Sequence, residues 1–505
     1  MLVAAIARIE RLRFKGLAYL ALAVALHCGA AAAQTVPPVD HATQTSILDL
    51  VPPDATTQHV LSTSEGELNY TATAGTIDLY QGNGQLGAKV FYTAYTLSGR
   101  DPDRPITFAF NGGPGAASAY LHLGLAGPHV IDLGAEDGFG ATPRLRPNLD
   151  TWLAFTDLVF IDPVGTGWSR AQSDEAARAY YGVDRDAESL ARAIAIHIEK
   201  TGHLSSPKFL LGESYGGFRA GKVATALRER QGIVLSGIVM VSPFLEGRHI
   251  ASTSDDPLSA ALQFPSLAAA ELERTGRFTE AAQAEAERFA MTDYLLGLAD
   301  PPPPGTVANG FWDRIANYTG IPLTDVARVR GYVGAIYASR TGETGKALSS
   351  YDAALAYPSR DPGANHPSGA DPVLDGRTRA YAAAFVSYAR EKLGIGSRMS
   401  YTLLNEEANS RWDWDGSRFT ASAMGDLADM LAVNPSFQLM ILHGFSDPLT
   451  PYRVSEYLFE QLPPELTARR VFLTNYRGGH MFYSDPISRQ KAAADAQRFY
   501  RETGS

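Results

Sequence analysis

Ser214, Asp447 and His480 are the residues of this 505-residue chain whose types and settings best suit nucleophilic chemistry. Ser214 is the centre of a G-x-S-x-G motif, G-E-S-Y-G at 212–216, which follows the apolar run 209–211 and precedes a helical pattern. A sharp strand-to-helix turn of this kind presents the serine hydroxyl above the edge of a sheet. A serine at its ordinary pKa is a weak nucleophile, so it needs a base, and the base needs an orienting acid.

The base and the acid are predicted in loops that follow two late strands. The apolar run 439–442 leads to Asp447, and the run 471–473 leads to the glycine-rich loop that carries His480. The chain order serine, acid, histidine is the order found in folds that carry their nucleophile on such a strand-to-helix turn. His443 is a rival base, but it precedes the acid in sequence, and we interpret it as a packed structural histidine.

An early glycine-rich loop, N-G-G-P-G at 111–115, follows the apolar run 106–110. Acyl transfer needs two donors for the developing oxyanion, one from such a loop and one from the residue after the nucleophile. We therefore predict that the backbone N–H groups of Gly113 and Tyr215 form an oxyanion hole. The alternative is a tight turn that needs glycine for steric reasons alone.

Buried strands that alternate with helical patterns must position these residues. This alternation is typical of a parallel sheet. The chain is predicted to adopt an α/β-hydrolase fold, with a mostly parallel central sheet flanked by helices and a largely helical cap insertion. The predicted strands are 106–110, 158–161, 209–211, 238–241, 439–442 and 471–473, and the predicted helices are 184–200, 217–230 and 488–501.

Composition changes along the chain suggest five segments. They are a signal peptide at 1–33, a polar leader at 34–65, the first part of the core at 66–244, a mostly helical cap insertion at 245–405, and the second part of the core at 406–505. Within the insertion, the run 266–299 is rich in Ala, Glu and Leu and is predicted to be helical, with an interruption at Gly276.

The first 33 residues have the pattern of a secretory signal. Four cations precede the apolar stretch 16–26, and Ala31-Ala32-Ala33 offers a small-residue cleavage site. We expect an exported protein, periplasmic or secreted, without a stable membrane span after cleavage; an uncleaved anchor is the alternative. Cleavage would also remove Cys28, the one cysteine of the chain, so no disulfide is expected.

The remaining patterns argue against several classes of partner. A net charge of −10 without a long basic run disfavours nucleic acid, which requires a concentrated positive surface. No metal site and no cofactor are expected, because the histidines lack a ligand spacing such as H-E-x-x-H. The G-x-G-x-x-G match at 82–87 is followed by the β-prone run 88–97 rather than a helix, so we interpret it as a hairpin turn and not as a nucleotide site. The sequence carries no pattern that predicts an oligomeric state.

Five ordered blocks of the chain together resemble the serine carboxypeptidase family, the S10 peptidases. They are N-G-G-P-G at 111–115, D-P-V-G-T-G-W-S at 162–169, G-E-S-Y-G-G at 212–217, Gly444 with Asp447, and G-H-M at 479–481. The resemblance implies hydrolysis of peptides with a free C-terminus through an acyl-enzyme on Ser214. It also implies that Asn111 and Glu213 bind the terminal carboxylate of the substrate.

The chain departs from the family pattern at two positions, and the first of them concerns specificity. Leu125 stands where many members have a second glutamate that binds the carboxylate, and Ala116 stands where they have a cysteine. A cation could compensate for the missing glutamate, although a solvated surface position is the favoured interpretation for each of the three candidates: Arg219, Lys222 and Arg477.

Two other functions remain open at this point. The same triad could serve an esterase or an acyltransferase, because it does not dictate the leaving group. A non-catalytic binding protein is a lower alternative, which a broken triad would have favoured. Trp168, Tyr452 and Phe482 stand beside motif residues, and each is as well suited to the pocket as to the core.

Overall fold

The computed structural model describes residues 46–63, 66–99, 101, 103–133, 144–300, 310–339, 345–361 and 371–503. The chain divides into a first unit, Met1–Gln44, and a second unit, Thr45–Ser505. All the described residues belong to the second unit. The predicted signal peptide at 1–33 and the start of the predicted leader lie outside the described residues.

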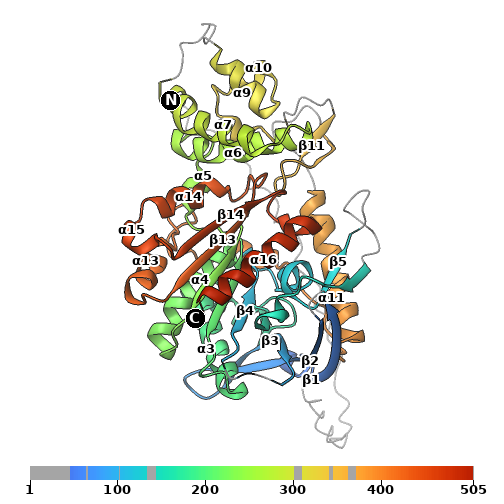
Figure 1. The fold of residues 1–505 in the computed structure, drawn as a ribbon. Coiled ribbons are helices and arrows are strands. Elements are labelled where there is room, and N and C mark those ends of the chain that lie inside the picture. Colours follow the sequence, from blue (N-terminus) through green and yellow to red (C-terminus); the bar gives the residue numbers. More distant parts are fainter. Residues whose placement is uncertain are drawn as a thin grey trace, which may run out of the picture. The chain divides into compact units, whose positions relative to one another are not determined.

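A ten-stranded mixed sheet runs through the second unit (Figure 1). Its order is β1-β2-β3-β7-β4-β9-β10-β13-β14, with β8 paired to β3. Strands β1 to β3 and β7 pair antiparallel, and the pairs from β7 to β14 are parallel. The bounds are β1 Ala55–Thr63, β2 Gly66–Tyr80, β3 Leu86–Leu97, β4 Ile106–Phe110, β7 Asp157–Ile161, β8 Arg170–Ala171, β9 Lys208–Glu213, β10 Gly237–Val241, β13 Gln438–Gly444 and β14 Val471–Tyr476.

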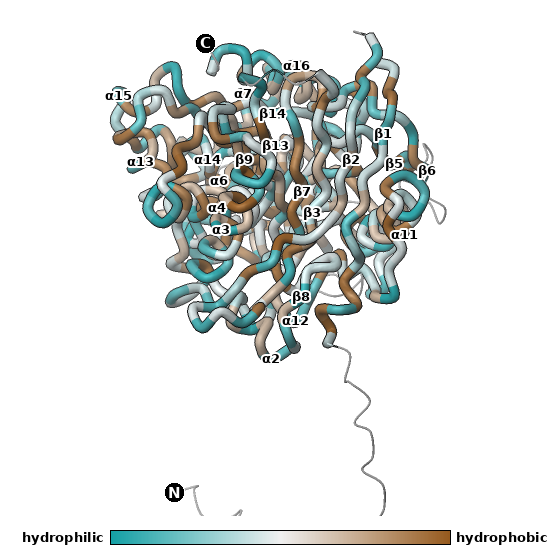
Figure 2. Tube along the Cα trace, turned by 90° about the horizontal axis from the view of Figure 1, so that it is seen from below, coloured by the Kyte–Doolittle hydropathy of each residue, from teal (hydrophilic) through white to brown (hydrophobic). Residues whose placement is uncertain are grey.

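The central strands β4, β7, β9 and β10 are buried along their whole length because both faces of the sheet are covered. On β9, Leu210 packs into one hydrophobic cluster, while Phe209 and Leu211 pack into another. This period-two alternation between two cores is typical of a parallel sheet between helical layers. Seen from below in Figure 2, the apolar residues concentrate along the central strands β3, β7 and β9. All six strands that the sequence predicted for this part are confirmed.

Helices α3, α4 and α13 contribute to the cluster on one face, and α11 and α16 to the cluster on the other. The predicted helices 184–200, 217–230 and 488–501 correspond to α3, α4 and α16. The bounds of these and the other core helices are α1 Ala119–Leu121, α2 Asp174–Ala177, α3 Val183–Thr201, α4 Tyr215–Ala226, α11 Arg377–Glu391, α12 Glu406–Ser410, α13 Met424–Val433, α14 Tyr452–Glu460, α15 Pro464–Thr467 and α16 Pro486–Thr503.

The predicted leader at 34–65 is wrong in its second half. Residues 55–63 form the edge strand β1, which pairs with β2 over its whole length. The sequence signal was weak because most side chains of β1 remain partly or fully exposed, and Leu61 is its one buried residue. The predicted hairpin that excluded a nucleotide site is confirmed, since β2 and β3 pair antiparallel around the turn at 81–85.

The predicted insertion at 245–405 is largely helical but does not form one body. Helices α6 to α9 surround a hydrophobic cluster of their own, which extends to Ala353. Helix α11 instead packs into the core beside the sheet. The bounds of the remaining elements are α5 Gly247–Ala251, α6 Pro257–Arg274, α7 Glu280–Phe289, α8 Leu295–Ala299, α9 Phe311–Thr319, α10 Leu323–Arg328, and a small hairpin of β11 Lys346–Leu348 with β12 Ala356–Pro358. The expected interruption at Gly276 separates α6 from α7, and its φ of +68° is left-handed.

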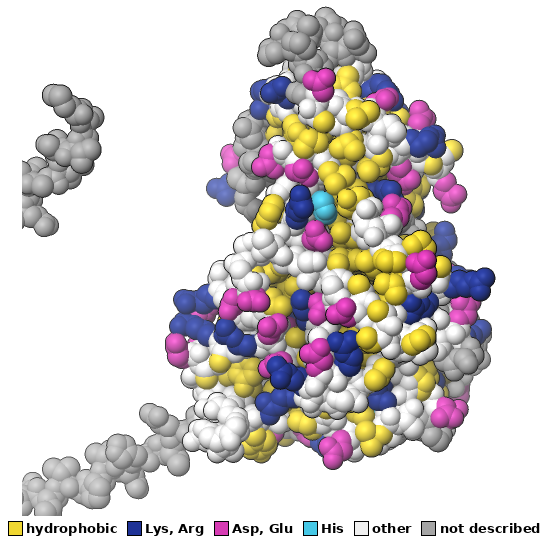
Figure 3. All heavy atoms as spheres, turned by 90° about the vertical axis from the view of Figure 1, so that its left-hand side faces the viewer, with side chains coloured by type: hydrophobic (Ala, Val, Ile, Leu, Met, Phe, Trp, Pro, Cys, Tyr) yellow, Lys and Arg dark blue, Asp and Glu magenta, His cyan; other side chains and the backbone are white. Residues whose placement is uncertain are grey.

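The surface shown in Figure 3 carries acidic and basic side chains interspersed with apolar ones. No single sign of charge dominates this face. Within the described ranges, no helix combines the length and the apolar character that crossing a membrane requires.

Candidate active site

Ser214 occupies a strained turn between β9 and α4. Its φ of 60° and ψ of −126° are unusual for a residue with a side chain. The turn is closed by hydrogen bonds from Ser214 N to Val241 O (2.9 Å) and from Phe244 N to Ser214 O (3.0 Å). A Cβ atom on Gly212 would lie 2.0 Å from Gly216 O, so the flanking glycine is required by close approach. The G-x-S-x-G motif therefore forms the elbow that its sequence context predicted.

Asp447 and His480 lie next to each other in the loops that follow β13 and β14. His480 Nδ1 is 2.8 Å from Asp447 Oδ2, and both side chains are buried. Thr450 Oγ1 lies 2.8 Å from the same carboxylate oxygen, and the N–H groups of Leu449 and Thr450 donate to Asp447 Oδ1. Burial lowers the pKa of His480, but the charge and hydrogen bond of Asp447 outweigh it, so the net pKa is raised. The carboxylate is thus placed to orient the imidazole and to stabilise its protonated form.

A segment of the insertion supports the His480 loop. His480 N donates to Tyr351 O at 2.7 Å, and the Tyr351 ring meets the imidazole edge-on with the centroids 5.6 Å apart. The next residue, Asp352, accepts a hydrogen bond from Ser446 Oγ (2.8 Å), beside Asp447. The predicted cap therefore fixes both loops that carry the base and the acid.

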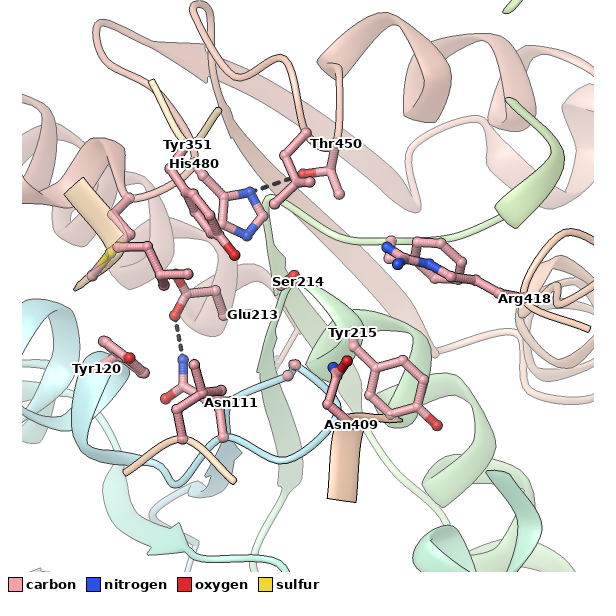
Figure 4. A pocket seen from close by; sticks show the side chains of 18 of the residues that line it. Asn111, Tyr120, Glu213, Ser214, Tyr215, Tyr351, Asn409, Arg418, Thr450 and His480 are labelled. Carbon is pink, nitrogen blue, oxygen red and sulfur yellow. Dashed lines mark hydrogen bonds between the residues drawn. The ribbon is translucent and has the colours of Figure 1, made fainter. Parts of the chain in front are cut away.

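All the predicted site residues except Asp447 line one cavity of about 250 Å³ (Figure 4). Asp447 contacts Nδ1 of the His480 imidazole and does not itself line the cavity. Ser214 and His480 both line it, and no hydrogen bond joins these two described side chains. Such contacts commonly tighten when substrate binds. The predicted residues that line the cavity are Asn111, Gly113, Glu213, Ser214, Tyr215 and His480.

The two predicted oxyanion donors lie on adjoining segments of this cavity. A Cβ atom on Gly112 would lie 2.5 Å from Tyr215 N, so the glycine-rich loop presses against the elbow. The N–H of Tyr215 is at the first residue of α4, where a helix has no internal acceptor. Within the described residues, the N–H groups of Gly113 and Tyr215 have no hydrogen-bond acceptor. They are therefore available to a ligand oxygen beside Ser214.

Glu213 and Asn111 form a buried pair at one end of the cavity. Asn111 Nδ2 donates to Glu213 Oε2, and Tyr483 Oη donates to Glu213 Oε1 at 2.8 Å. Asn111 is itself oriented by Leu121 N, which donates to its Oδ1 at 3.1 Å. Burial raises the pKa of Glu213 to about 7, against the smaller opposing effects of His480 and the two hydrogen bonds. Below about pH 7, most of this carboxyl group is therefore protonated and can donate a hydrogen bond.

Arg219 is not a solvated surface charge, contrary to the favoured interpretation of its sequence. It is 1% exposed, and its Nε lies 2.6 Å from Asp186 Oδ2 on α3. Its Nη1 donates to Asn111 O, and its guanidinium lies 5.0 Å from the centre of the Tyr215 ring. Asp186 lies on another helix, so no local sequence pattern marked it as the partner of Arg219. Arg219 thus braces the elbow from behind.

The other two candidate cations are engaged away from the cavity. Lys222 Nζ lies 2.6 Å from Asp426 Oδ2, and Arg477 Nε lies 2.7 Å from Glu273 Oε1. Neither lines the cavity, so neither compensates for the missing glutamate there. Leu125 is fully buried in the core, so that position contributes nothing to the cavity.

The position of His443 confirms the prediction that it is a packed structural histidine. It is fully buried, its Nε2 lies 2.8 Å from Ser455 Oγ, and burial lowers its pKa to about 4. Trp168, Tyr452 and Phe482 also belong to the interior and not to the cavity. The described residues contain no cluster of three His, Cys, Asp or Glu side chains suited to a metal ion.

Sequence reasoning missed several residues that line the cavity. They are Tyr120, Phe244, Tyr351, Asn409, Trp414, Arg418 and Thr450, among others. Thr450 had a usable signal, because Asp447 caps its own loop through an Asp-x-x-Thr spacing. The others come from distant segments, and no local pattern marks them.

Comparison with known proteins identifies relatives of one part of this chain. Residues 65–261 match the family model of the serine carboxypeptidases, Peptidase S10. Over 189 residues the chain is 27% identical to serine carboxypeptidase-like 44 of Arabidopsis thaliana, covering 36% of this chain and 37% of that protein. Over 182 residues it is 28% identical to the pheromone-processing carboxypeptidase KEX1 of Yarrowia lipolytica, covering 35% of this chain and 27% of that protein.

A solved structure shows the same fold over a larger part of the chain. The Kex1 prohormone-processing carboxypeptidase of Saccharomyces cerevisiae superposes with a TM-score of 0.52 at 14% identity, covering 84% of this chain and 91% of that chain. The protein therefore has the predicted α/β-hydrolase fold. The sequence matches themselves span less than two fifths of either curated relative. Residues 65–261, which carry the N-G-G-P-G loop and the Ser214 elbow, belong to the serine carboxypeptidase family.

Proposed function

We propose that the protein is an exported serine carboxypeptidase, which removes the C-terminal residue of a peptide through an acyl-enzyme on Ser214. The observation that carries the proposal is the Glu213–Asn111 pair, which lies in the same cavity as Ser214 and His480. Two groups that can bind a carboxylate stand beside a nucleophile and its base. Export is supported by the signal pattern of residues 1–33.

In the proposed reaction, His480 Nε2 accepts the proton of Ser214 Oγ as the oxygen attacks the last peptide carbonyl. The N–H groups of Gly113 and Tyr215 stabilise the oxyanion, and the protonated imidazole gives its proton to the leaving amine. Water, deprotonated by the same imidazole, then hydrolyses the ester. Asp447 keeps the imidazole in the required tautomer throughout.

The terminal carboxylate of the substrate would accept hydrogen bonds from Asn111 Nδ2 and from protonated Glu213. Two ionised carboxylates in direct contact would repel each other. The raised pKa of Glu213 removes that repulsion below about pH 7. Tyr120 and Tyr351 also line this cavity and supply hydroxyl groups in the absence of a glutamate at position 125. Binding of a free C-terminus should therefore be strongest in mildly acidic solution.

The proposal is tested with N-blocked dipeptides that carry a free or an amidated C-terminus, across pH 4 to 8. We expect release of the free terminal residue, slower turnover of the amide, and a loss of kcat of ~10⁴ to 10⁶ in the Ser214→Ala variant. Ser436→Ala, an exposed serine outside the cavity, is the matched control. Turnover of esters with every peptide left intact would establish the alternative, an esterase or acyltransferase, which the buried Leu125 favours.

A further inference from the structure

The cavity continues past Ser214 onto an aromatic surface formed by Tyr215, Phe244 and Trp414. The Trp414 ring lies 5.4 Å from the Tyr215 ring and 5.7 Å from the Phe244 ring, centroid to centroid. The Tyr215 hydroxyl is held by Trp412 Nε1 at 3.1 Å. Because several contacts fix these rings, they form a rigid wall of the cavity.

Arg418 lies over this aromatic wall. Its guanidinium carbon is 5.5 Å from the centre of the Phe244 ring and 5.8 Å from the centre of the Trp414 ring. Stacking of this kind orients a guanidinium without consuming its N–H donors. Arg418 is exposed, and within the described residues its side chain has no hydrogen bond and no ion pair with a carboxylate. It is therefore an oriented cation in the cavity with donors to spare.

The field of Arg418 reaches across the cavity. Burial raises the pKa of Tyr351 to about 12 together with nearby acids, whereas the Arg418 charge acts in the opposite direction. Among the described residues that line the cavity, the titratable side chains besides Arg418 are Glu213, His480 and the three tyrosines Tyr120, Tyr215 and Tyr351. No ionised carboxylate of the lining therefore competes with a substrate for this guanidinium below about pH 7.

The position of Arg418 relative to Ser214 assigns it to one side of the scissile bond. In Figure 4, Ser214 lies between Glu213 with Asn111 on one side and Arg418 on the other. If Glu213 and Asn111 hold the terminal carboxylate, the leaving residue occupies their side. The residue that forms the acyl-enzyme must then extend toward Arg418.

We propose that Arg418 selects substrates with an acidic side chain on the residue that acylates Ser214. This inference rests on the proposed function, because the direction of the substrate follows from it. The aromatic wall would contact the methylene groups of a glutamate side chain while the guanidinium binds its carboxylate in the bidentate manner that this geometry allows. Arg418 is thus a specificity residue and takes no part in proton transfer.

The test compares N-blocked dipeptides that differ only in the acyl residue, Glu against Gln, with the same C-terminal residue. We expect kcat/KM to be about fivefold higher for Glu at low ionic strength, the size typical of a partly exposed ion pair. The Glu-to-Gln ratio should fall to about one in Arg418→Gln and decrease in 0.5 M salt, which screens such pairs. The control Arg390→Gln, an exposed arginine on α11, should keep the wild-type ratio.

A second pair of substrates separates this inference from the carboxypeptidase proposal. Ethyl esters of N-blocked Glu and Gln place the same side chains on the acyl side without a terminal carboxylate. If peptides are not cleaved but the ester ratio is still abolished by Arg418→Gln, the carboxypeptidase proposal fails and the role of Arg418 stands. A wild-type ratio near one, or a ratio unchanged in Arg418→Gln, would overturn the role of Arg418 itself.

Discussion

Replacing Glu213 by Gln should change how the stability of the protein depends on pH. The pKa of Glu213 is raised from 4.5 to about 7, chiefly because the carboxyl group is buried. Each pH unit of such a shift corresponds to ~1.4 kcal/mol, so the shift amounts to about 3 kcal/mol. Because the group is buried, solvent screening does not reduce this figure appreciably.

The sign follows from which state holds the proton. Below pH 4.5 both the folded and the unfolded chain carry protonated Glu213, and its contribution is fully present. Between 4.5 and about 7 the unfolded chain releases the proton while the folded chain keeps it, so the folded state loses stability as pH rises. Glutamine cannot titrate, and the variant should lack this loss. Glutamine has one acceptor oxygen where Glu213 has two, so the variant loses one of the hydrogen bonds from Asn111 and Tyr483. This loss lowers the free energy of unfolding by an amount that does not vary with pH.

Urea unfolding of the wild type and of Glu213→Gln from pH 4 to pH 8 measures this directly. The difference in the free energy of unfolding should shift by about 3 kcal/mol over that range, in favour of the variant at high pH. The exposed Glu199→Gln is the matched control. A difference that stays constant from pH 4 to pH 8 would refute the reasoning. In activity assays, kcat/KM for a free C-terminus should fall above about pH 7 in the wild type and lose this fall in Glu213→Gln.

Three further substitutions test the surroundings of the site. Tyr483→Phe removes a donor to the Glu213 carboxylate, so the alkaline limb of the pH–rate profile should move to higher pH; a move to lower pH would contradict this. Thr450→Val removes a hydroxyl that donates to Asp447 beside His480, so kcat should drop about tenfold with KM little changed. An unaltered kcat would show that this hydroxyl does not contribute to catalysis. Arg219→Met leaves Asp186 buried and unpaired, which should cost about 3 to 5 kcal/mol in urea unfolding; a cost below about 1 kcal/mol would exclude the bracing role.

The sequence was most informative for residues that follow a continuous apolar strand. The strands 209–211 and 439–442 are continuous apolar runs because the sheet is covered on both faces, and they placed Ser214 and Asp447 at strand ends. The edge strand β1 was missed because it buries little, so hydrophobic periodicity could not mark it. Periodicity reports burial, and an edge strand is held largely by backbone hydrogen bonds.

The parts of the cavity that set specificity could not be predicted. Tyr351 and Arg418 reach the cavity from segments far from Ser214 in sequence, and their contacts arise only from tertiary packing. The burial of Arg219 could not be predicted either. Arginine is usually a surface residue, and here it is buried because it pairs with Asp186 on another helix. Trp168 shows the reverse case, a residue beside a motif that belongs to the core.

The most direct test of the central proposal is to trap the acyl-enzyme. The wild-type protein is mixed with an N-blocked peptide that has a free C-terminus, quenched with acid within one turnover, digested with trypsin and analysed by mass spectrometry. Cleavage after Lys208 and Arg219 yields a peptide of residues 209–219, which contains Ser214 as its one serine. We predict that this peptide gains the mass of the acyl group and that Ser214→Ala gains none. An acyl group on any other peptide, or product release without a covalent intermediate, would contradict the proposal.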